Sequence, residues 1–378
     1  MPETASFLTV FTALDLFLAI VIGFFLVRLG RRVRPELRTF WRFFALSALF
    51  CFLADWALLA ALPYFQLSYG PVGSSLLLIS GLRLLFFTPA FYLLLRRPVR
   101  RNAIVLLVML VFLQAGIFAF EVDGFYIEPF RLGVTELPVH APAFLPGRPL
   151  RILQISDLHV ERITQRERAV LAQAEALRPD IIVLTGDYVN SSYTRDPVTL
   201  QETRQILSQL HAPFGIYAVN GNVDTPAVMS ALFDGLANIR VLNNEVFPLK
   251  LPSGTLYFIG VSMTSSTPDE KVLRALISEL PPDTYRVLLY HTHEIIGASS
   301  SGDVNLYLSG HTHGGQIRLP LYGAIFTDSY YGKKYEMGEY TVGPTTLYVS
   351  RGIGMAGGFM PRVRFLCPPE LVLVELGK

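Results

Sequence analysis

Two histidines, His311 and His313, stand one residue apart in the stretch GHTHGG, where glycines flank them on both sides. Imidazole is the commonest metal-binding side chain in proteins, and glycine permits a turn that aims both rings at one point. An isolated pair of this kind is also typical of a polar turn. A metal site at these histidines therefore requires further ligands elsewhere in the chain.

Four other motifs place carboxylate, amide or imidazole side chains after a short apolar run. In chain order they are ISDLH, LTGDY, GNVD and YHTHE, which contain Asp157, His159, Asp187, Asn222, Asp224, His291 and His293. A single Asp or Asn at a strand end is usually a turn former or a helix cap. Five such motifs, each after an apolar run with the character of a strand, indicate one common site instead.

The side chains of this set offer nitrogen and oxygen ligands without a thiolate. Such a set suits manganese, iron or zinc, whereas calcium takes only oxygen ligands. The ligands are too many for one tetrahedral zinc ion, but two ions about 3.5–4 Å apart, bridged by a carboxylate, use them all. Two histidines from one turn are then able to face different ions.

The elements that must position these motifs lie in the second part of the chain. From residue 151 onward, apolar segments such as RILQIS, DIIVLT and GIYAVN alternate with amphipathic segments of helical character. This alternation predicts an α/β domain over residues 151–378 with a largely parallel sheet at its start, and ligands of such sheets gather beyond the carboxyl ends of the strands. Residues 123–150 predict an extended linker that includes a first β segment.

Residues 1–122 differ in composition, with 11 Arg, 5 acidic residues and four long apolar stretches. The stretches, at about 5–27, 40–62, 74–95 and 103–120, are long enough to cross a membrane as helices, and they predict an N-terminal four-helix transmembrane domain. The connections RLGRRVRPELR and RRPVRR are strongly basic and are expected in the cytoplasm. This multi-pass topology places the α/β domain on the outer, periplasmic or extracellular side.

Three charged residues, Asp15, Asp55 and Arg83, lie inside the apolar stretches. Charges within a membrane are costly unless they are paired, and they often mark a functional site. Two interpretations remain open: a polar pocket for a lipid headgroup or an ion path, and an Arg–Asp cluster that fixes helix packing, with the second slightly favoured. The small net charge of +2 argues against nucleic-acid binding.

In chain order, the motifs D-x-H, G-D, G-N, H and G-H-x-H resemble those of the calcineurin-like metallophosphoesterases, and GHTHGGQIRLP is most similar to a bacterial, membrane-associated branch of that family. The resemblance covers residue 128 to the C-terminus and implies a four-layer αββα sandwich that binds two divalent metal ions, with manganese favoured over iron and zinc. It also implies ligand roles. The first ion would be held by Asp157, His159 and His313, the second by Asn222, His291 and His311, and both by Asp187 as a bridge.

The resemblance further implies hydrolysis of a phosphoric ester by a hydroxide that bridges the two ions. In one respect the chain departs from the family: the third motif commonly reads G-N-H-[DE], with the His as general acid, but Val223 stands in that place. General acid catalysis is typically worth about 10²–10⁴-fold. Three consequences remain open: the substrate has a good leaving group, another residue donates the proton, or turnover is low. The candidate proton donor is His293, which joins Asp187 and Asn222 as a predicted catalytic residue. The alternative interpretation is that His293 is an exposed histidine in a loop.

These observations predict a membrane-anchored dinuclear phosphodiesterase or pyrophosphatase of the bacterial inner membrane, with lipid-linked phosphoesters among its candidate substrates. The resemblance allows a nucleotide-diacylglucosamine pyrophosphatase, although that substrate is cytoplasmic and the predicted topology faces outward. The alternative is a membrane sensor or scaffold whose metal-binding domain has little turnover. An intact ligand set favours the enzyme.

Overall fold

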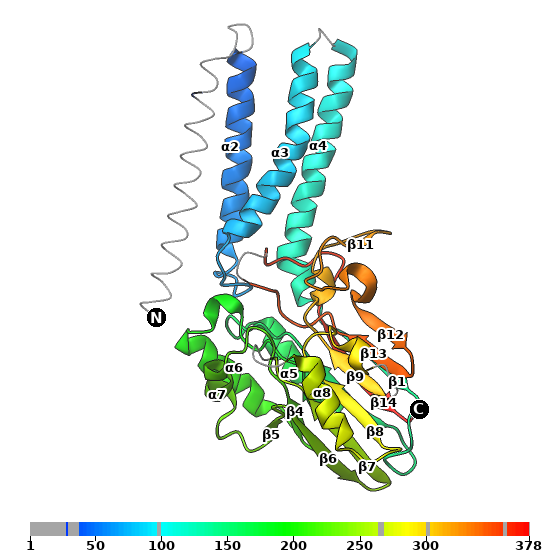
Figure 1. The fold of residues 1–378 in the computed structure, drawn as a ribbon. Coiled ribbons are helices and arrows are strands. Elements are labelled where there is room, and N and C mark those ends of the chain that lie inside the picture. Colours follow the sequence, from blue (N-terminus) through cyan, green and yellow to red (C-terminus); the bar gives the residue numbers. More distant parts are fainter. Residues whose placement is uncertain are drawn as a thin grey trace. The chain divides into compact units, whose positions relative to one another are not determined.

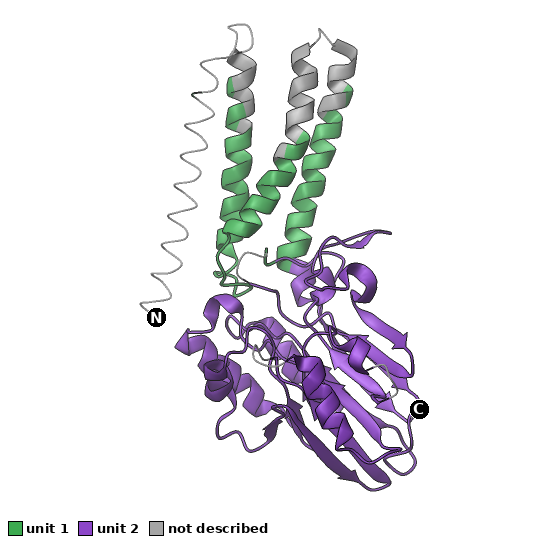
Figure 2. Ribbon diagram, viewed as in Figure 1, with its two compact units in different colours: residues 1–126, 359–362 green, residues 127–358, 363–378 purple. Residues whose placement is uncertain are grey.

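The computed structural model describes Arg28 and residues 38–96, 100–263, 268–299, 303–357 and 361–377. The first predicted apolar stretch, residues 5–27 with Asp15, lies outside the described residues. Contacts divide the chain into unit 1, Met1–Tyr126 with Phe359–Arg362, and unit 2, Ile127–Gly358 with Val363–Lys378 (Figure 2). Each unit is described here by itself.

The described part of unit 1 contains three long apolar helices, α2 (Arg38–Ala61), α3 (Gly73–Arg96) and α4 (Arg100–Val122) (Figure 1). Helix α3 contacts both α2 and α4. Among the described residues, one helical segment, Val108–Phe130, is long and apolar enough to cross a membrane, and Ala48–Ala61 is a shorter apolar segment. Because one such helix is weak evidence, the four-helix transmembrane domain stays a prediction.

Charged residues from the predicted membrane stretches form a cluster between these helices. The Arg83 guanidinium donates two hydrogen bonds to the Asp55 carboxylate, Nε to Oδ2 at 2.7 Å and Nη2 to Oδ1 at 2.5 Å, and a third to Gln114 Oε1 at 2.5 Å. The sequence prediction missed Glu121, which is buried with Oε2 3.6 Å from Arg83 Nη2. The two-bond pairing of Arg83 with Asp55 is the geometry expected of a cluster that fixes helix packing.

Unit 2 contains two six-stranded sheets (Figure 1). The first has the strand order β1 (Gly133–Val139), β14 (Glu370–Leu376), β2 (Leu150–Ile155), β3 (Ile181–Leu184), β4 (Ile216–Ala218) and β5 (Ile239–Val241). The second has the order β12 (Gly338–Val342), β13 (Thr345–Val349), β9 (Leu306–Ser309), β8 (Tyr285–Leu289), β7 (Gly254–Gly260) and β6 (Glu245–Leu251). Strands β2 to β5 are parallel, as the sequence predicts, and so are β7, β8, β9 and β13.

The main hydrophobic core lies between the two sheets. Buried side chains of the first sheet, such as Ile152 and Val183, belong to the same cluster as Phe258 and Val287 of the second. Because side chains alternate along a strand, each sheet also has an outer face that needs a cover. The outer face of the second sheet packs against α8 and α9, where Leu273 joins the strand residues in a further cluster.

The helices of unit 2 are α5 (Gln165–Leu177), α6 (Pro197–Gln209), α7 (Pro226–Phe233), α8 (Asp269–Ser278) and α9 (Ile296–Ser299). Three of them begin at caps that the sequence encodes: Thr164 forms a capping box with Glu167 at α5, and Asp196 and Thr225 cap α6 and α7 directly before proline. Helices α5 to α7 lie beside the first sheet (Figure 1). The order of layers, helices, sheet, sheet, helices, agrees with the α/β fold that the motifs implied.

Short elements complete unit 2. A two-stranded sheet consists of β10 (Arg318–Leu319) and β11 (Gly323–Ala324). Single helical turns of unit 2 occupy Glu128–Phe130, Ser191–Tyr193, His313–Gly315 and Gly332–Tyr335. A further short helix, Asp123–Ile127, begins in unit 1 and ends at the first residue of unit 2.

The motif-bearing loops leave the two sheets at the ends of neighbouring parallel strands. In the first sheet, Ile155, Leu184 and Ala218 are paired in line across the ends of β2, β3 and β4. In the second, Leu289 at the end of β8 pairs with Leu308 of β9. Because parallel strands in register end at one edge of a sheet, the loops that follow them emerge side by side.

Candidate metal centre

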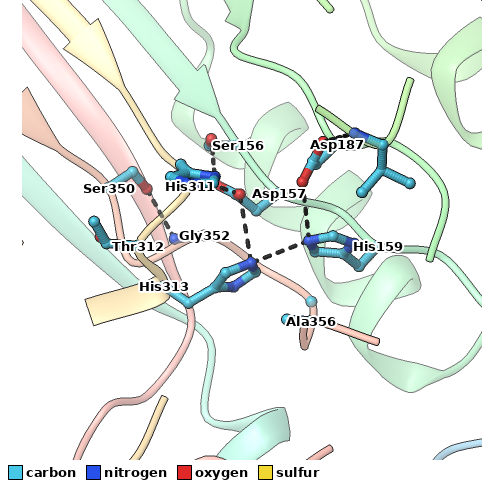
Figure 3. Close-up of polar contacts among 12 residues, drawn as sticks. Ser156, Asp157, His159, Asp187, His311, Thr312, His313, Ser350, Gly352 and Ala356 are labelled. Carbon is cyan, nitrogen blue, oxygen red and sulfur yellow. Dashed lines mark hydrogen bonds and ion pairs between the residues drawn. The ribbon is translucent and has the colours of Figure 1, made fainter. Parts of the chain in front are cut away.

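The seven predicted ligands follow five strands: Asp157 and His159 after β2, Asp187 after β3, Asn222 after β4, His291 after β8, and His311 and His313 after β9. Three strands come from the first sheet and two from the second. Figure 3 shows side chains from the loops after β2, β3 and β9 side by side, and contacts of Asn222 and His291 join the loops after β4 and β8 to them. Gln154 joins the two edges, because its Nε2 donates to Thr185 Oγ1 at 3.0 Å and across to the Ser309 carbonyl at 2.9 Å. The structure therefore brings together residues that lie up to 156 positions apart in the sequence.

The first group of ligand atoms comes from Asp157, His159 and His313, all of which are buried. The Nε2 atoms of His159 and His313 lie 3.0 Å apart, and Asp157 Oδ1 lies 3.5 Å from His313 Nε2 (Figure 3). Ligand atoms bound to one ion at about 2.1 Å lie roughly 3.0–3.4 Å from one another in tetrahedral or octahedral geometry. The spacing of this group fits a single shared ion.

The second group comes from Asn222, His291 and His311. Asn222 Oδ1 lies 3.1 Å from His291 Nε2 and 3.1 Å from His311 Nδ1. Asp187 connects the groups, because its Oδ2 lies 3.4 Å from His159 Nε2 and 3.3 Å from His291 Nε2. Asp157 Oδ1 also approaches His291 Nε2, but at the longer distance of 3.9 Å. The geometry thus favours Asp187 over Asp157 as the carboxylate shared between two ions.

His291 provides the clearest test of whether a cation fits here. Its Nδ1 lies 2.7 Å from the Thr185 carbonyl, which only accepts, so Nδ1 carries a proton and donates it. The remaining nitrogen, Nε2, faces Asn222 Oδ1 and Asp187 Oδ2. The lone pair of Nε2 repels these oxygen lone pairs unless a positive charge lies between them. A backbone carbonyl that accepts from the other ring nitrogen of a ligating histidine is typical of metal sites. The donor set therefore fits a metal ion.

Burial and mutual charge control the pKa values of the cluster. Burial lowers the pKa of His159 to about 4 and holds the pKa of His313 well below its usual range, so both rings are neutral with a lone pair available at neutral pH. Burial also raises the pKa of Asp157 to about 6. At His291 burial opposes protonation, but Asp187 outweighs it and raises the pKa to about 10. The additional proton would lie on Nε2. The oxygens around Nε2 attract positive charge, whether it is this proton or a metal ion.

The backbone at the ligands is unusual. Five of the seven predicted ligands have positive φ, which is uncommon for residues other than glycine: Asp157 (51°), His159 (41°), Asp187 (57°), His311 (73°) and His313 (51°). Such conformations cost of order 1–3 kcal/mol each and cluster at functional sites, where the surrounding structure enforces them. The tight turns after β2, β3 and β9 thus aim side chains into the cluster at a conformational cost.

Two glycines allow the loops to approach so closely. A Cβ atom on Gly310 would lie 2.0 Å from Ser156 Oγ and 2.1 Å from Asp157 Oδ2. A Cβ atom on Gly221 would lie 2.2 Å from Asp187 Oδ1. The glycine before His311 is therefore required by contact with Asp157 of the other sheet, a reason that the local sequence does not reveal.

Positioning residues were the main omission of the sequence prediction. Asp224, noted there without a role, accepts backbone hydrogen bonds from Asp187 (2.6 Å), Gly221 (2.8 Å) and Tyr188 (3.0 Å), and so holds the loops after β3 and β4 together. Burial and the charge of Asp187 raise the pKa of Asp224 to about 7. The position of Asp224 in the GNVD motif was the available signal.

Arg364 is the second omission, and no local pattern singles it out. This fully buried guanidinium donates to the carbonyls of Arg351, Gly352, Gly354 and Cys367, and its Nη2 lies 3.5 Å from His313 Nδ1. Burial lowers its pKa to about 10, which leaves it charged at neutral pH. Arg364 supports the loop behind His313 rather than joining the ligands.

Val223 and His293 are the two residues that bear on whether the site has a general acid. Val223 donates its backbone N–H to Asp187 Oδ1 at 3.0 Å and offers no side-chain proton. His293 is buried, so the interpretation as an exposed loop histidine is wrong. Its Nε2 lies 2.7 Å from Ser329 Oγ, and its ring packs near Tyr331 and Tyr335. Burial and nearby His311 lower its pKa to about 4, so the ring is neutral at neutral pH.

Comparison with known proteins gives a consistent result. The sequence profile of the calcineurin-like phosphoesterases matches residues 150–315. The chain is 33% identical over 262 residues to the metallophosphoesterase YkuE of Bacillus subtilis, an alignment that covers 66% of this chain and 87% of YkuE. It is 30% identical to phosphodiesterase YaeI of Escherichia coli, covering 66% and 90%. It is 28% identical to the UDP-2,3-diacylglucosamine pyrophosphatase LpxG of Chlamydia trachomatis, covering 66% and 91%.

Proposed function

Because the chain belongs to the calcineurin-like phosphoesterase family and is a metal-dependent phosphoester hydrolase, we propose that it is a membrane-anchored dinuclear enzyme that cleaves a phosphodiester or a pyrophosphate. One observation carries the proposal. Imidazole, carboxylate and amide atoms from the loops after five strands form two adjacent groups, in which neighbouring ligand atoms lie 3.0–3.5 Å apart.

The proposal assigns the ligands as follows: Asp157, His159 and His313 hold one ion, Asn222, His291 and His311 hold the other, and Asp187 is shared. Nitrogen and oxygen donors without thiolate suit manganese, iron or zinc, and we favour manganese. When bound, the two ions would supply Lewis-acid polarisation of the phosphoryl group and a lowered pKa for a nucleophilic water.

The protein's own contribution is to hold these groups in place. Asp187 is oriented by the Val223 N–H at 3.0 Å, and His291 by the Thr185 carbonyl at 2.7 Å. Val223, which follows Asn222, has no side-chain proton to give to a leaving oxygen. A substrate with a good leaving group is therefore the consequence we propose first, because the His293 ring is neutral at neutral pH. Proton donation by His293 is the second consequence, and low turnover is ranked last.

Membrane anchoring and a lipid-linked substrate belong to the same proposal. Support comes from the apolar helix Val108–Phe130 and from the name of LpxG, a relative whose stated substrate is a nucleotide-linked diacylglucosamine. The basic connections of residues 1–122 favour a multi-pass protein of the bacterial inner membrane with unit 2 on the outer side. A reporter fused after residue 378 tests the orientation, and an inward-facing reporter contradicts it.

Hydrolysis of bis-p-nitrophenyl phosphate and p-nitrophenyl phosphate by the detergent-purified full chain tests the activity. We expect metal-stripped protein to be inactive, added Mn²⁺ to restore cleavage of the diester with the monoester much slower, and Asp187→Asn to abolish it. Asp283→Asn is the matched control, because Asp283 is exposed and its φ of 56° suits asparagine. No turnover by protein shown to carry metal would favour the alternative, a membrane sensor or scaffold.

A further inference from the structure

Between residues 319 and 331, unit 2 exposes a concentration of large apolar and aromatic side chains. Of the eleven such side chains that are exposed in the described part of unit 2, seven lie in this stretch, which we call the apolar loop. Leu321 is fully exposed, Tyr330 is 97% exposed, and Tyr322, Ile325 and Phe326 are each more than half exposed. Single exposed apolar side chains are ordinary, but a group of them on one segment marks an interaction surface.

The backbone of the apolar loop points to the same conclusion. The loop contains β11 and the end of β10, which form a sheet separate from the two six-stranded sheets (Figure 1). Leu321, in the turn between these strands, has a φ of 64°, which is a genuine outlier for a bulky residue. Asparagine or glycine would form such a turn without strain and without an exposed apolar group. The fold of unit 2 gains nothing from leucine here, which indicates a contact outside the protein.

The charges of this region favour an anionic surface. Lys333 and Lys334, which follow the apolar loop directly, are exposed. Lys333 Nζ lies 3.5 Å from the ring centroid of Tyr322, so a positive charge and an aromatic side chain of the loop lie side by side. Asp328, the acidic residue of the loop, has its Oδ2 4.0 Å from His311 Nε2 at the metal centre. Lysines and tyrosines beside aliphatic side chains are typical of the interface between lipid headgroups and acyl chains.

A lipid bilayer fits this surface better than a second protein does. A protein partner would need a hollow shaped for each protruding side chain, whereas fluid lipid adapts to them. Unit 2 also follows the apolar helix Val108–Phe130, and only residues 131–132 separate the end of this helix from β1. In the proposed membrane-anchored protein, unit 2 is therefore tethered close to the bilayer. Such a tether makes even weak insertion effective, because it raises the local concentration.

Direct contacts join the apolar loop to the turn after β9 that carries two of the proposed metal ligands. Arg318, the residue before the loop, donates from Nη1 to the Gly314 carbonyl of this turn at 2.8 Å. A Cβ atom on Gly315 would lie 2.4 Å from Ala324 Cβ, so the turn and β11 pack without space between them. A surface that binds the loop therefore lies close to the proposed metal ions.

We propose that the apolar loop inserts into the headgroup layer of an anionic lipid bilayer and holds the metal centre at that surface. The inference rests on the membrane anchoring of the proposed function. It adds the place where the substrate is bound, because a phosphodiester in the headgroup layer reaches the metal ions without leaving the bilayer.

Fluorescence quenching tests the insertion. The full chain with Cys51→Ser and Ile325→Cys is labelled with an environment-sensitive fluorophore in vesicles of equal parts phosphatidylcholine and phosphatidylglycerol, and the remaining cysteine, Cys367, is buried. We expect lipids that carry a nitroxide near the headgroup to remove about half of the fluorescence of this label. The matched control is a label at Ser208→Cys, on the exposed face of α6, which should keep its fluorescence.

Leu321→Asn separates insertion from folding, because asparagine suits a φ of 64° while the apolar tip is lost. We expect weaker quenching of the Ile325→Cys label and, in vesicles with Mn²⁺, about tenfold lower kcat/KM for phosphatidyl-p-nitrophenol, in line with the burial of one leucine in lipid. Hydrolysis of soluble bis-p-nitrophenyl phosphate should be unchanged. In both substrates water adds to phosphorus and p-nitrophenolate leaves. Val198→Asn, which removes an exposed apolar side chain of α6, should change neither rate.

The outcomes are distinguishable. A label at Ile325→Cys that is quenched no more than the label at Ser208→Cys, or equally with Leu321→Asn, overturns the insertion. Blue-shifted emission without quenching shows that protein covers the loop, and it also overturns the insertion. Equal loss of both activities in Leu321→Asn assigns the loop to support of the metal centre instead. Absence of hydrolysis of both substrates by metal-loaded protein overturns the proposed function, whereas the quenching still decides the insertion.

Discussion

Asp224→Asn tests how the metal centre is assembled, because Asp224 touches no proposed ligand side chain but holds two ligand loops together. Its Oδ2 accepts from the N–H groups of Asp187 at 2.6 Å and Gly221 at 2.8 Å, and its Oδ1 accepts from Tyr188 at 3.0 Å. Asparagine has nearly the same shape but only one acceptor. Placed with its carbonyl at the Oδ2 position, it keeps two bonds and turns its NH₂ group toward the N–H of Tyr188.

The magnitude follows from this exchange. A hydrogen bond to a charged acceptor contributes about 1.5–3 kcal/mol, and a buried N–H without a partner costs about 1–3 kcal/mol. Both quantities describe the same lost bond to the Tyr188 N–H, so they are not added in full. We expect the free energy of unfolding to fall by about 3 kcal/mol. For a unit of roughly 250 residues this corresponds to a Tm lower by about 6–12 °C. Displacement of outer-shell partners of metal ligands typically costs about 10–100-fold in metal affinity or activity.

Thermal unfolding of the full chain in detergent, followed by intrinsic fluorescence at pH 8, measures the first effect, and hydrolysis of bis-p-nitrophenyl phosphate with Mn²⁺ measures the second. Because a two-unit protein need not unfold in one step, the transition of unit 2 is compared at a single scan rate with the control Asp283→Asn. A Tm within 1 °C of the control together with a rate within twofold would refute the positioning role.

Three further predictions concern other contacts. Gly221→Ala places a Cβ atom 2.2 Å from Asp187 Oδ1 and should lower diester hydrolysis at least tenfold, which a steady-state assay measures; full activity would show that the loops can separate. Arg83→Met leaves the buried Asp55 carboxylate without its partner and should destabilise unit 1 by about 3–5 kcal/mol in thermal unfolding, with partial recovery when Asp55 is also replaced by leucine. His293→Gln should slow cleavage of alkyl diesters more than of p-nitrophenyl diesters if His293 donates the proton, and equal slowing contradicts that role.

The sequence alone indicated which side chains form the candidate site and which strand ends carry them. Ligand types, their order and the apolar run before each motif are local properties, and they predicted which side chains would gather at one candidate site. The alternation of apolar and amphipathic segments predicted the α/β fold. Charge and hydropathy likewise separated residues 1–122 from the rest. The number of membrane-crossing helices was not resolved in the same way, because apolarity and length alone do not distinguish a membrane span from a buried helix.

Tertiary structure decided which of these local features meet. The pairing of β2, β3 and β4 in one sheet and of β8 and β9 in the other brings the five motifs to one place, and this pairing depends on long-range contacts. The roles of Asp224 and Arg364, the burial of His293 and the contact that requires Gly310 all arise between segments far apart in the chain. Local sequence patterns specify the types of ligand atom, whereas only the packing of the two sheets determines the distances between these atoms.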